Sequence, residues 1–89
     1  MRIKVKVTEQ AHADMVEIQE TDPESYSTVI EGLSKLEHDQ QPEELKWEPL
    51  GAYDRISVGK YVALYEVVSA RETEGSETER QVRVLRVRK

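Results

Sequence analysis

The stretch YDRISVGKYVALYEV, from Tyr53 to Val67, decides the fold of this chain. Apolar residues alternate with polar ones before Gly59, and glycine at that point favours a tight turn because it tolerates a positive φ. After the turn, residues 60–68 are apolar at both alternating sets of positions, which is typical of a strand in the interior of a sheet. The stretch therefore predicts a β-hairpin with strands over 53–58 and 60–68.

The last run, residues 81–87, predicts one more strand with an irregular pattern. Strict alternation would place Val82 and Val84 on the same face as Arg86 and Arg88. An apolar face that becomes cationic requires either a β-bulge or a strand that is covered at one end only.

The N-terminal segment predicts a strand followed by a helix. In RIKVKV (2–7) apolar and basic residues alternate, as in a strand with one buried and one cationic face. Thr8 stands at the N-cap position of a helix whose first residue is Glu9. The apolar stripe of this helix contains Ala11, Met15, Val16 and Ile18.

A second helix follows directly. TDPE (21–24) indicates a stop and a restart, because proline cannot continue a helix but suits a first turn, and Thr21 with Glu24 fits a capping box. Apolar residues then recur at helical spacing at Tyr26, Val29, Ile30, Leu33 and Leu36. The predicted order is strand, helix, helix, strand, strand, strand: an α+β domain with a helical hairpin packed on one face of an antiparallel sheet.

Length and composition restrict the function further. Eighty-nine residues predict a single domain over 1–89, and the absence of cysteine excludes disulfides and thiolate chemistry. The alternating N-terminus is typical of neither a signal peptide nor a membrane span, so we expect a cytoplasmic protein with no membrane partner. The segment 38–52 is interpreted as a connection, and the charged segment 69–79 as a long mobile loop.

Charge is distributed unevenly along the chain. The net charge is −5, yet residues 80–89 carry five basic residues and no acidic one, whereas residues 9–44 carry eleven acids and only Lys35 as a cation. Two interpretations of the basic segments are open. The cations of the first, second and last predicted strands, among them Arg55, either converge on a concave face that holds a phosphate backbone, or pair with the acidic helices of the same chain.

Other chemistry receives no support from the sequence. His12 and His38 have no ligand spacing and are interpreted as surface residues, so neither a metal nor a cofactor is expected. The acidic outer face of the helices is interpreted as a solvated surface, and Glu43 with Glu44 likewise.

The order of elements and the central hairpin together resemble the RelE/ParE superfamily of toxins from toxin–antitoxin modules. LKWEPLGAYDRISVGKYVALYEV (45–67) is similar to the family's hairpin with its valine-glycine turn and tyrosine-rich strand, and VRVLRVRK (82–89) is similar to its last strand. The resemblance implies a RelE-like fold over the whole chain. It also implies an antitoxin as partner, because a cationic groove in so small a domain suits an acidic, partly disordered protein that folds across it.

The activity that the resemblance implies is ribosome-dependent cleavage of mRNA, in which a 2′-hydroxyl attacks the adjacent phosphate. Arg55 matches the first arginine of the family's hairpin strand, and Arg88 or Lys89 stands in for the family's C-terminal arginine. The candidate catalytic cations around the phosphate are Arg55, Arg86 and Arg88. The candidate substrate contacts are Lys46, Lys89 and Tyr65, and the alternative interpretation of Tyr65 is that it is a core residue.

Two positions depart from the family's pattern. Ser57 and Val62 stand where arginines are usual, so the nuclease lacks two cations. The alternative function is therefore a non-catalytic or gyrase-targeting binding protein with the same fold. A solitary domain without a partner remains a third possibility.

Overall fold

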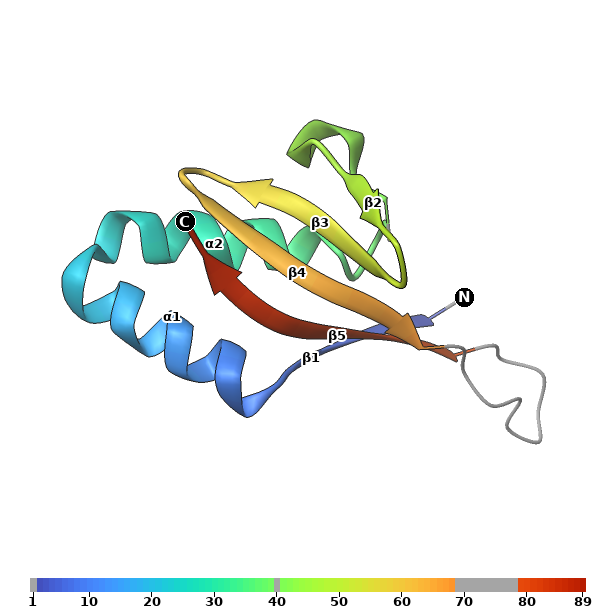
Figure 1. Cartoon of the computed structure of the whole chain (residues 1–89), viewed down its shortest axis with the longest axis horizontal. Coiled ribbons are helices and arrows are strands. Elements are labelled where there is room, and N and C mark those ends of the chain that lie inside the picture. The colour runs from blue at the N-terminus through green and yellow to red at the C-terminus, as the bar shows by residue number, and fades with distance from the viewer. Residues whose placement is uncertain (1, 40, 69–78) are drawn as a thin grey trace.

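The computed structural model describes residues 2–39, 41–68 and 79–89, which form a sheet with two helices on one of its faces (Figure 1). In chain order the elements are β1 (Arg2–Val7), α1 (Glu9–Thr21), α2 (Pro23–Lys35), the 3₁₀-helix η1 (Glu43–Leu45), β2 (Glu48–Leu50), β3 (Tyr53–Val58), β4 (Tyr61–Val68) and β5 (Glu79–Arg88). The predicted α+β class is confirmed. Of the predicted loop over 69–79, residues 69–78 lie outside the described residues, whereas Glu79 belongs to β5.

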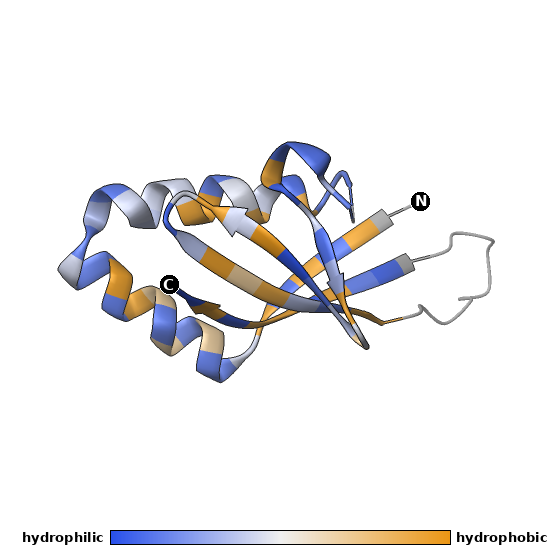
Figure 2. Ribbon diagram, turned by 45° about the horizontal axis from the view of Figure 1, so that its top comes forward, coloured by the Kyte–Doolittle hydropathy of each residue, from blue (hydrophilic) through white to orange (hydrophobic). Residues whose placement is uncertain are grey.

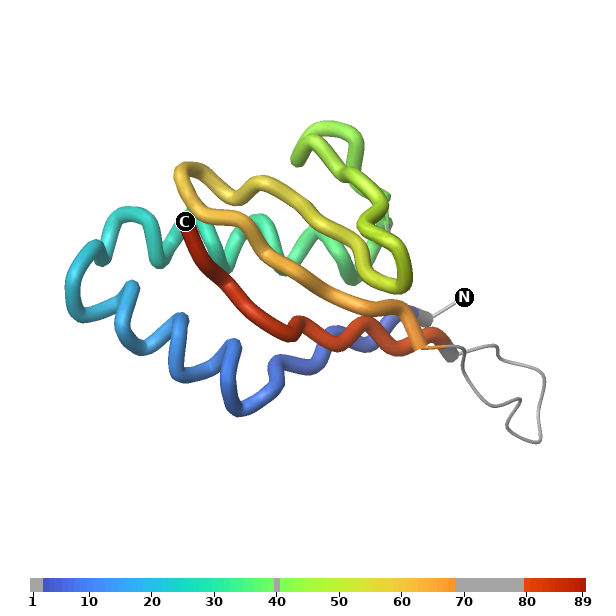
Figure 3. The backbone as a smooth tube through the Cα atoms, viewed as in Figure 1, coloured from blue at the N-terminus to red at the C-terminus, as the bar shows by residue number. Residues whose placement is uncertain are grey.

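The sheet is mixed, with the strand order β1-β5-β4-β3-β2. The predicted antiparallel meander is formed by β3, β4 and β5, while β1 pairs with β5 in parallel, with Val5 opposite Val82. Both of these strands run toward the same end of the molecule (Figure 3). The short edge strand β2 lies within the segment predicted as a connection. It was not predicted because three residues, one of them Pro49, are too few to show the alternation of a strand.

Local capping determines where the two helices begin. Thr8 Oγ1 accepts a hydrogen bond from Ala11 N at 3.3 Å, so the predicted cap of α1 is confirmed. The predicted capping box between Thr21 and Glu24 is wrong: α2 begins at Pro23, and its N-cap is Asp22, whose carboxylate accepts from Ser25 N. Thr21 instead belongs to the last turn of α1, where its hydroxyl donates to the carbonyl of residue 17.

The core lies between the helices and the sheet. α1 packs on β5 and α2 packs on β3, and apolar and polar residues alternate along β1 in the hydropathy colouring (Figure 2). The buried apolar residues are Ala11, Met15, Ile18, Val29, Leu33, Leu36, Ile56, Val58, Tyr61, Ala63, Tyr65, Val82, Val84 and Val87. Burial of these side chains supplies the main driving force for folding.

The hairpin forms as predicted, with one difference on its outer face. Val58 pairs with Tyr61 across a turn in which Gly59 has a φ of +69°. β4 is an interior strand, as predicted, but Val62 and Leu64 on its second face are only half-buried. No helix or strand of the described ranges covers that face, which we call the open face.

Candidate anion-binding face

A β-bulge in β5 turns the C-terminal arginines toward the open face. Tyr65 pairs with Val84 and Leu64 pairs with Arg86, so Leu85 has no partner of its own on β4. The extra residue shifts the alternation, so that Val87 joins the core and Arg86 faces away from it. The irregular pattern of the last strand predicts a bulge or partial covering, and the structure contains the bulge.

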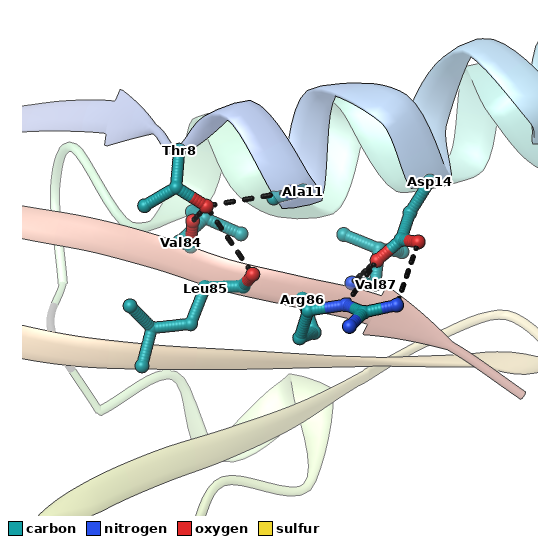
Figure 4. A network of polar contacts seen from close by, with 7 residues as sticks. All are labelled: Thr8, Ala11, Asp14, Val84, Leu85, Arg86 and Val87. Carbon is teal, nitrogen blue, oxygen red and sulfur yellow. Dashed lines mark hydrogen bonds and ion pairs between the residues drawn. The ribbon is translucent and has the colours of Figure 1, made fainter.

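Thr8 holds this bulge from the start of α1 (Figure 4). Its backbone N donates to the carbonyl oxygen of Val84 at 3.1 Å. Its hydroxyl lies 2.9 Å from the same oxygen and 3.2 Å from the carbonyl oxygen of Leu85. One residue therefore both caps α1 and binds the two carbonyl groups at the irregularity, which joins the helix to the strand 76 positions away.

The registers place the cations in two rows across the open face. Leu64 of β4 pairs with Arg55 on one side and Arg86 on the other, and Val62 pairs with Ser57 and Arg88 in the same way. Strands two apart in a sheet are separated by about 9.5 Å, a distance that a phosphate group and two arginine side chains can span.

A depression of about 410 Å³ lies on this face. Its lining consists of three apolar residues and four cations: Leu50, Val62, Leu64, Arg55, Arg86, Arg88 and Lys89. Figure 3 shows the end of β5 next to the turn between β3 and β4, where Arg88 pairs in register with Val62. An apolar patch bordered by cations suits an anion that carries an apolar group.

The four cations differ in their partners. Arg55 lies 3.7 Å from a carboxylate oxygen of Glu48, and both side chains are exposed, so this pair is weak. Lys89 Nζ lies 5.8 Å from the ring centroid of Tyr61. Arg88 forms no ion pair with any residue of the described ranges.

Arg86 forms the strongest of these contacts, with Asp14 of α1. Arg86 Nε donates to Oδ2 at 2.9 Å and Nη2 donates to Oδ1 at 3.1 Å, and Val87 N also donates to Oδ2, at 3.0 Å (Figure 4). Burial raises the pKa of Asp14, but the hydrogen bonds from Arg86 and Val87 and the charges of Arg86 and Arg88 lower it more, so the net pKa lies below its usual value. The hydrogen bond to Asp14 raises the pKa of Arg86.

Of the six predicted site residues, the structure brings four together. Arg55, Arg86, Arg88 and Lys89 line the depression. Lys46 does not: it is exposed at the end of η1, where its φ of 55° places it in the left-handed region.

Tyr65 also lies away from the depression. Its side chain is fully buried among the core residues on the helix side of β4, and burial raises the pKa of its hydroxyl. The interpretation of Tyr65 as a core residue is therefore the correct one, and a direct contact with substrate on the open face is not compatible with this position.

Convergence of all the basic strand residues, one of the two interpretations left open by the sequence, is met only in part. Lys4 and Lys6 pair in register with Gln81 and Arg83, before the bulge, and neither lines the depression. The side chain of Arg2 lies outside the described residues. Lys4 and Lys6 are exposed on β1, at the edge of the sheet opposite β2.

Sequence reasoning missed two kinds of residue at this site. The first kind is the apolar lining of the depression. Val62 and Leu64 belong to a strand that was predicted to be buried on both faces, and Leu50 belongs to the segment that was predicted to be a connection. Asp14 was interpreted as one of many solvated acids of the helices. A signal for Asp14 was absent because its partner lies 72 residues away.

Other chemistry finds no support in the described residues. No group of three His, Asp or Glu side chains among them could hold a metal ion. None of the described helices has both the length and the apolar composition that crossing a membrane requires.

Comparison with known proteins shows similarity in structure only. No protein-family model matches the sequence, and no curated protein is similar to it in sequence. Several solved structures match over nearly their whole length. Three of them are a YoeB/ParE toxin from Agrobacterium tumefaciens (TM-score 0.76, 20% identity, 96% of each chain), a YoeB dimer from Staphylococcus aureus (0.70, 15%, 100% of this chain and 98% of that one) and the toxin–antitoxin complex RelBE2 from Mycobacterium tuberculosis (0.67, 22%, 99% and 98%).

These similarities identify the fold. Two helices on a mixed five-stranded sheet, in this order, form a RelE/YoeB-like domain. The resemblance to the RelE/ParE superfamily is thus confirmed at the level of the fold, whereas the function of a fold depends on the residues of its site.

Proposed function

We propose, on the premise that this chain has the fold of the YoeB and RelE toxins, that it is the toxin of a toxin–antitoxin module and cleaves mRNA on the ribosome. The observation that carries the proposal is the convergence of Arg55, Arg86, Arg88 and Lys89 around one depression on the open face. Cations from two strands on either side of β4 suit the backbone of a single strand of RNA, whose phosphates dominate binding.

In the proposed reaction the 2′-oxygen of one nucleotide forms a bond to the adjacent phosphorus, and the bond from phosphorus to the 5′-oxygen breaks. The 2′-hydroxyl loses its proton and the leaving oxygen gains one. Negative charge accumulates on the phosphate oxygens in between, and fixed cations stabilise it. A preorganised donor of this kind contributes about 3 to 4 kcal/mol to transition-state stabilisation.

We assign roles from the geometry of the rows. Arg55 and Arg88 contact the scissile phosphate from opposite sides of β4, and Arg86 contributes from a fixed position beside Asp14. Lys89 contacts the flanking substrate. The apolar side chains of Val62 and Leu64 form a surface on which a base or the ribose rests.

The test is primer extension across a reporter mRNA that is translated in a purified system. We expect the wild-type protein to produce breaks at ribosome-engaged codons, and Arg55→Ala with Arg88→Ala to reduce the cleavage rate by at least about 10³-fold. Arg83→Ala is the matched control, because Arg83 is on the same strand but pairs with Glu66 and does not line the depression. Unchanged cleavage in the double variant would refute the assignment of these residues.

A second function is favoured by the row that contains Arg88. The other two residues of this row, Ser57 and Val62, are uncharged. A row with a single cation suits a protein that binds through the open face without cleaving, such as a gyrase inhibitor. An intact message at high protein concentration, together with inhibition of DNA supercoiling by gyrase, would support this alternative. If the protein neither cleaves the message nor inhibits gyrase, both functions are rejected.

Both functions include an antitoxin. We propose an acidic, partly disordered protein that covers the basic open face, since such a segment gains both charge pairing and apolar contacts there. Co-expression with the product of the neighbouring reading frame, followed by size-exclusion chromatography, tests this. A stable complex supports the proposal, and its absence favours a solitary domain.

A further inference from the structure

Arg86 differs from the other arginines of the open face in how its charge is balanced. Two of its nitrogens bind the two oxygens of Asp14 in a parallel, bidentate arrangement, at 2.9 and 3.1 Å. This geometry is the one in which arginine also binds a phosphate, and it is among the strongest hydrogen-bonded pairs in proteins.

Asp14 is in turn held in place. Its side chain is 15% exposed, and its Oδ2 atom accepts a further hydrogen bond from Val87 N. A carboxylate that leaves this position would forfeit three hydrogen bonds and leave a backbone N–H without its partner. These contacts fix Asp14 beside Arg86.

The neighbouring pair provides the contrast. Glu48 lies 3.7 Å from Arg55, with side chains that are 58% and 41% exposed, so a phosphate can displace this carboxylate at little cost. Arg88 forms no ion pair within the described ranges, and its charge acts on Asp14 only at longer range. The three arginines thus differ in how directly a carboxylate balances their charge: Arg86 is bound by two hydrogen bonds, Arg55 by one weak contact and Arg88 by neither.

We propose that Asp14 is a positioning residue that makes Arg86 a fixed, charge-compensated group, so that Arg55 and Arg88 supply the net positive charge that binds the anion. This inference depends on the proposed function in one respect only, which is the identification of the bound anion as RNA. Arg86 keeps N–H groups that Asp14 does not use, because a guanidinium has five donors and two of them bind this carboxylate. It contributes an oriented hydrogen bond rather than a free charge.

The test compares Asp14→Asn with Glu17→Gln. Both remove one negative charge from α1. Asp14 and Glu17 both line a second groove, between α1 and the end of β5, that Arg86 and Arg88 also border, but Glu17 forms no ion pair with another described residue. The probe is a fluorescent single-stranded DNA oligonucleotide, which lacks the 2′-hydroxyl and so cannot be cleaved. Its affinity is measured by anisotropy at a series of salt concentrations.

We expect Asp14→Asn to steepen the dependence of log Kd on log salt by about 0.7, because the released Arg86 neutralises one more phosphate of a single strand. Glu17→Gln should leave the slope unchanged. Equal slopes in the two variants, or weaker binding by folded Asp14→Asn, would overturn the proposal.

If Asp14→Asn does not fold, a measurement on the wild-type protein tests the same proposal. In NMR spectra of the arginine side chains, the Nε–H signal of Arg86 should exchange slowly with water and stay in place when the oligonucleotide is added, while that of Arg88 shifts. A shift of Arg86 as large as that of Arg88 would overturn the inference. Neither measurement involves a ribosome or cleavage, so a failure of the nuclease proposal would leave both readable.

Discussion

Val62 of β4 lies directly opposite Arg88 of β5, and both line the depression on the open face. Because Val62 is apolar, this row of the sheet contains one cation, Arg88, where an arginine at position 62 would supply a second. The same row ends at Ser57 on β3. The chemistry of this row distinguishes a nuclease from a binding protein.

The double variant Ser57→Arg with Val62→Arg should bind single-stranded RNA more tightly. The slope of log Kd against log salt should steepen by about 0.7 for each new phosphate contact. If the protein is a nuclease, cleavage of translated mRNA should rise as well, since the added cations lie in the row of Arg88. Binding is measured by fluorescence anisotropy, and cleavage by primer extension.

The control for these added charges is Val16→Arg, at a position on α1 that is 38% exposed and does not line the depression. It should change neither quantity beyond the effect of one net charge. Tighter binding without any gain in cleavage would favour the non-catalytic alternative.

Gly32 should be intolerant of any side chain. A Cβ at this position would overlap Cγ1 of Val58, because α2 packs closely on β3 there. We expect Gly32→Ala to lower the free energy of unfolding by about 1 to 3 kcal/mol, measured by urea denaturation, and Val58→Ala in the same chain to recover part of the loss.

Ser27→Ala, at an exposed position of α2, is the control for Gly32 and should change stability by less than about 0.5 kcal/mol. Alanine in place of an unconstrained helical glycine stabilises by about 1 kcal/mol. A more stable Gly32→Ala protein would therefore contradict the close approach.

Thr8 should contribute to stability through both the helix cap and the bulge. Thr8→Ala removes the hydroxyl that accepts from Ala11 N and contacts the carbonyl groups of Val84 and Leu85. We expect a loss of about 1 to 2 kcal/mol in the free energy of unfolding, with most of it restored in Thr8→Ser. A loss no greater than that of Thr21→Ala, which affects an exposed hydroxyl at the other end of α1, would count against this role.

The stabilisation by Asp14 should depend on pH in a defined direction. Because its pKa in the folded protein lies below the ordinary value of 3.8, its contribution is fully present above that value and is lost as the pH falls below it, through the folded-state pKa. The difference in the free energy of unfolding between the wild type and Asp14→Asn should be constant from neutral pH to about pH 5 and then shrink.

Urea denaturation at successive pH values measures this difference, and Glu17→Gln controls for the loss of a carboxylate on the same helix. A difference that grows as the pH falls would show that Asp14 is not stabilised in its charged form.

Much of this fold is determined by patterns that are local in the sequence. The alternation around Gly59 predicts the hairpin, the position of Thr8 predicts the start of α1, and the proline at position 23 predicts the break between the helices. These features depend on backbone geometry and on side chains a few residues apart, so they can be recognised without knowledge of the fold. The error at Asp22 was a shift of one residue, because Thr and Asp both serve as N-caps.

The candidate site was only partly predictable for the same physical reason. The sequence alone identified the basic residues Arg55, Arg86, Arg88 and Lys89, and the irregularity of the last strand. Which of them converge depends on strand register, which is set by pairing between segments far apart in the chain. The register also placed Tyr65 in the core.

Only the tertiary structure decided which charged side chains are paired with one another. The carboxylate of Asp14 is one of eleven acids between residues 9 and 44, and nothing in its sequence neighbours distinguishes it. The packing of α1 on β5, and the bulge that Thr8 holds, bring it to Arg86. A salt bridge between distant residues requires the whole fold to form first, whereas a strand or a cap requires only its own few residues.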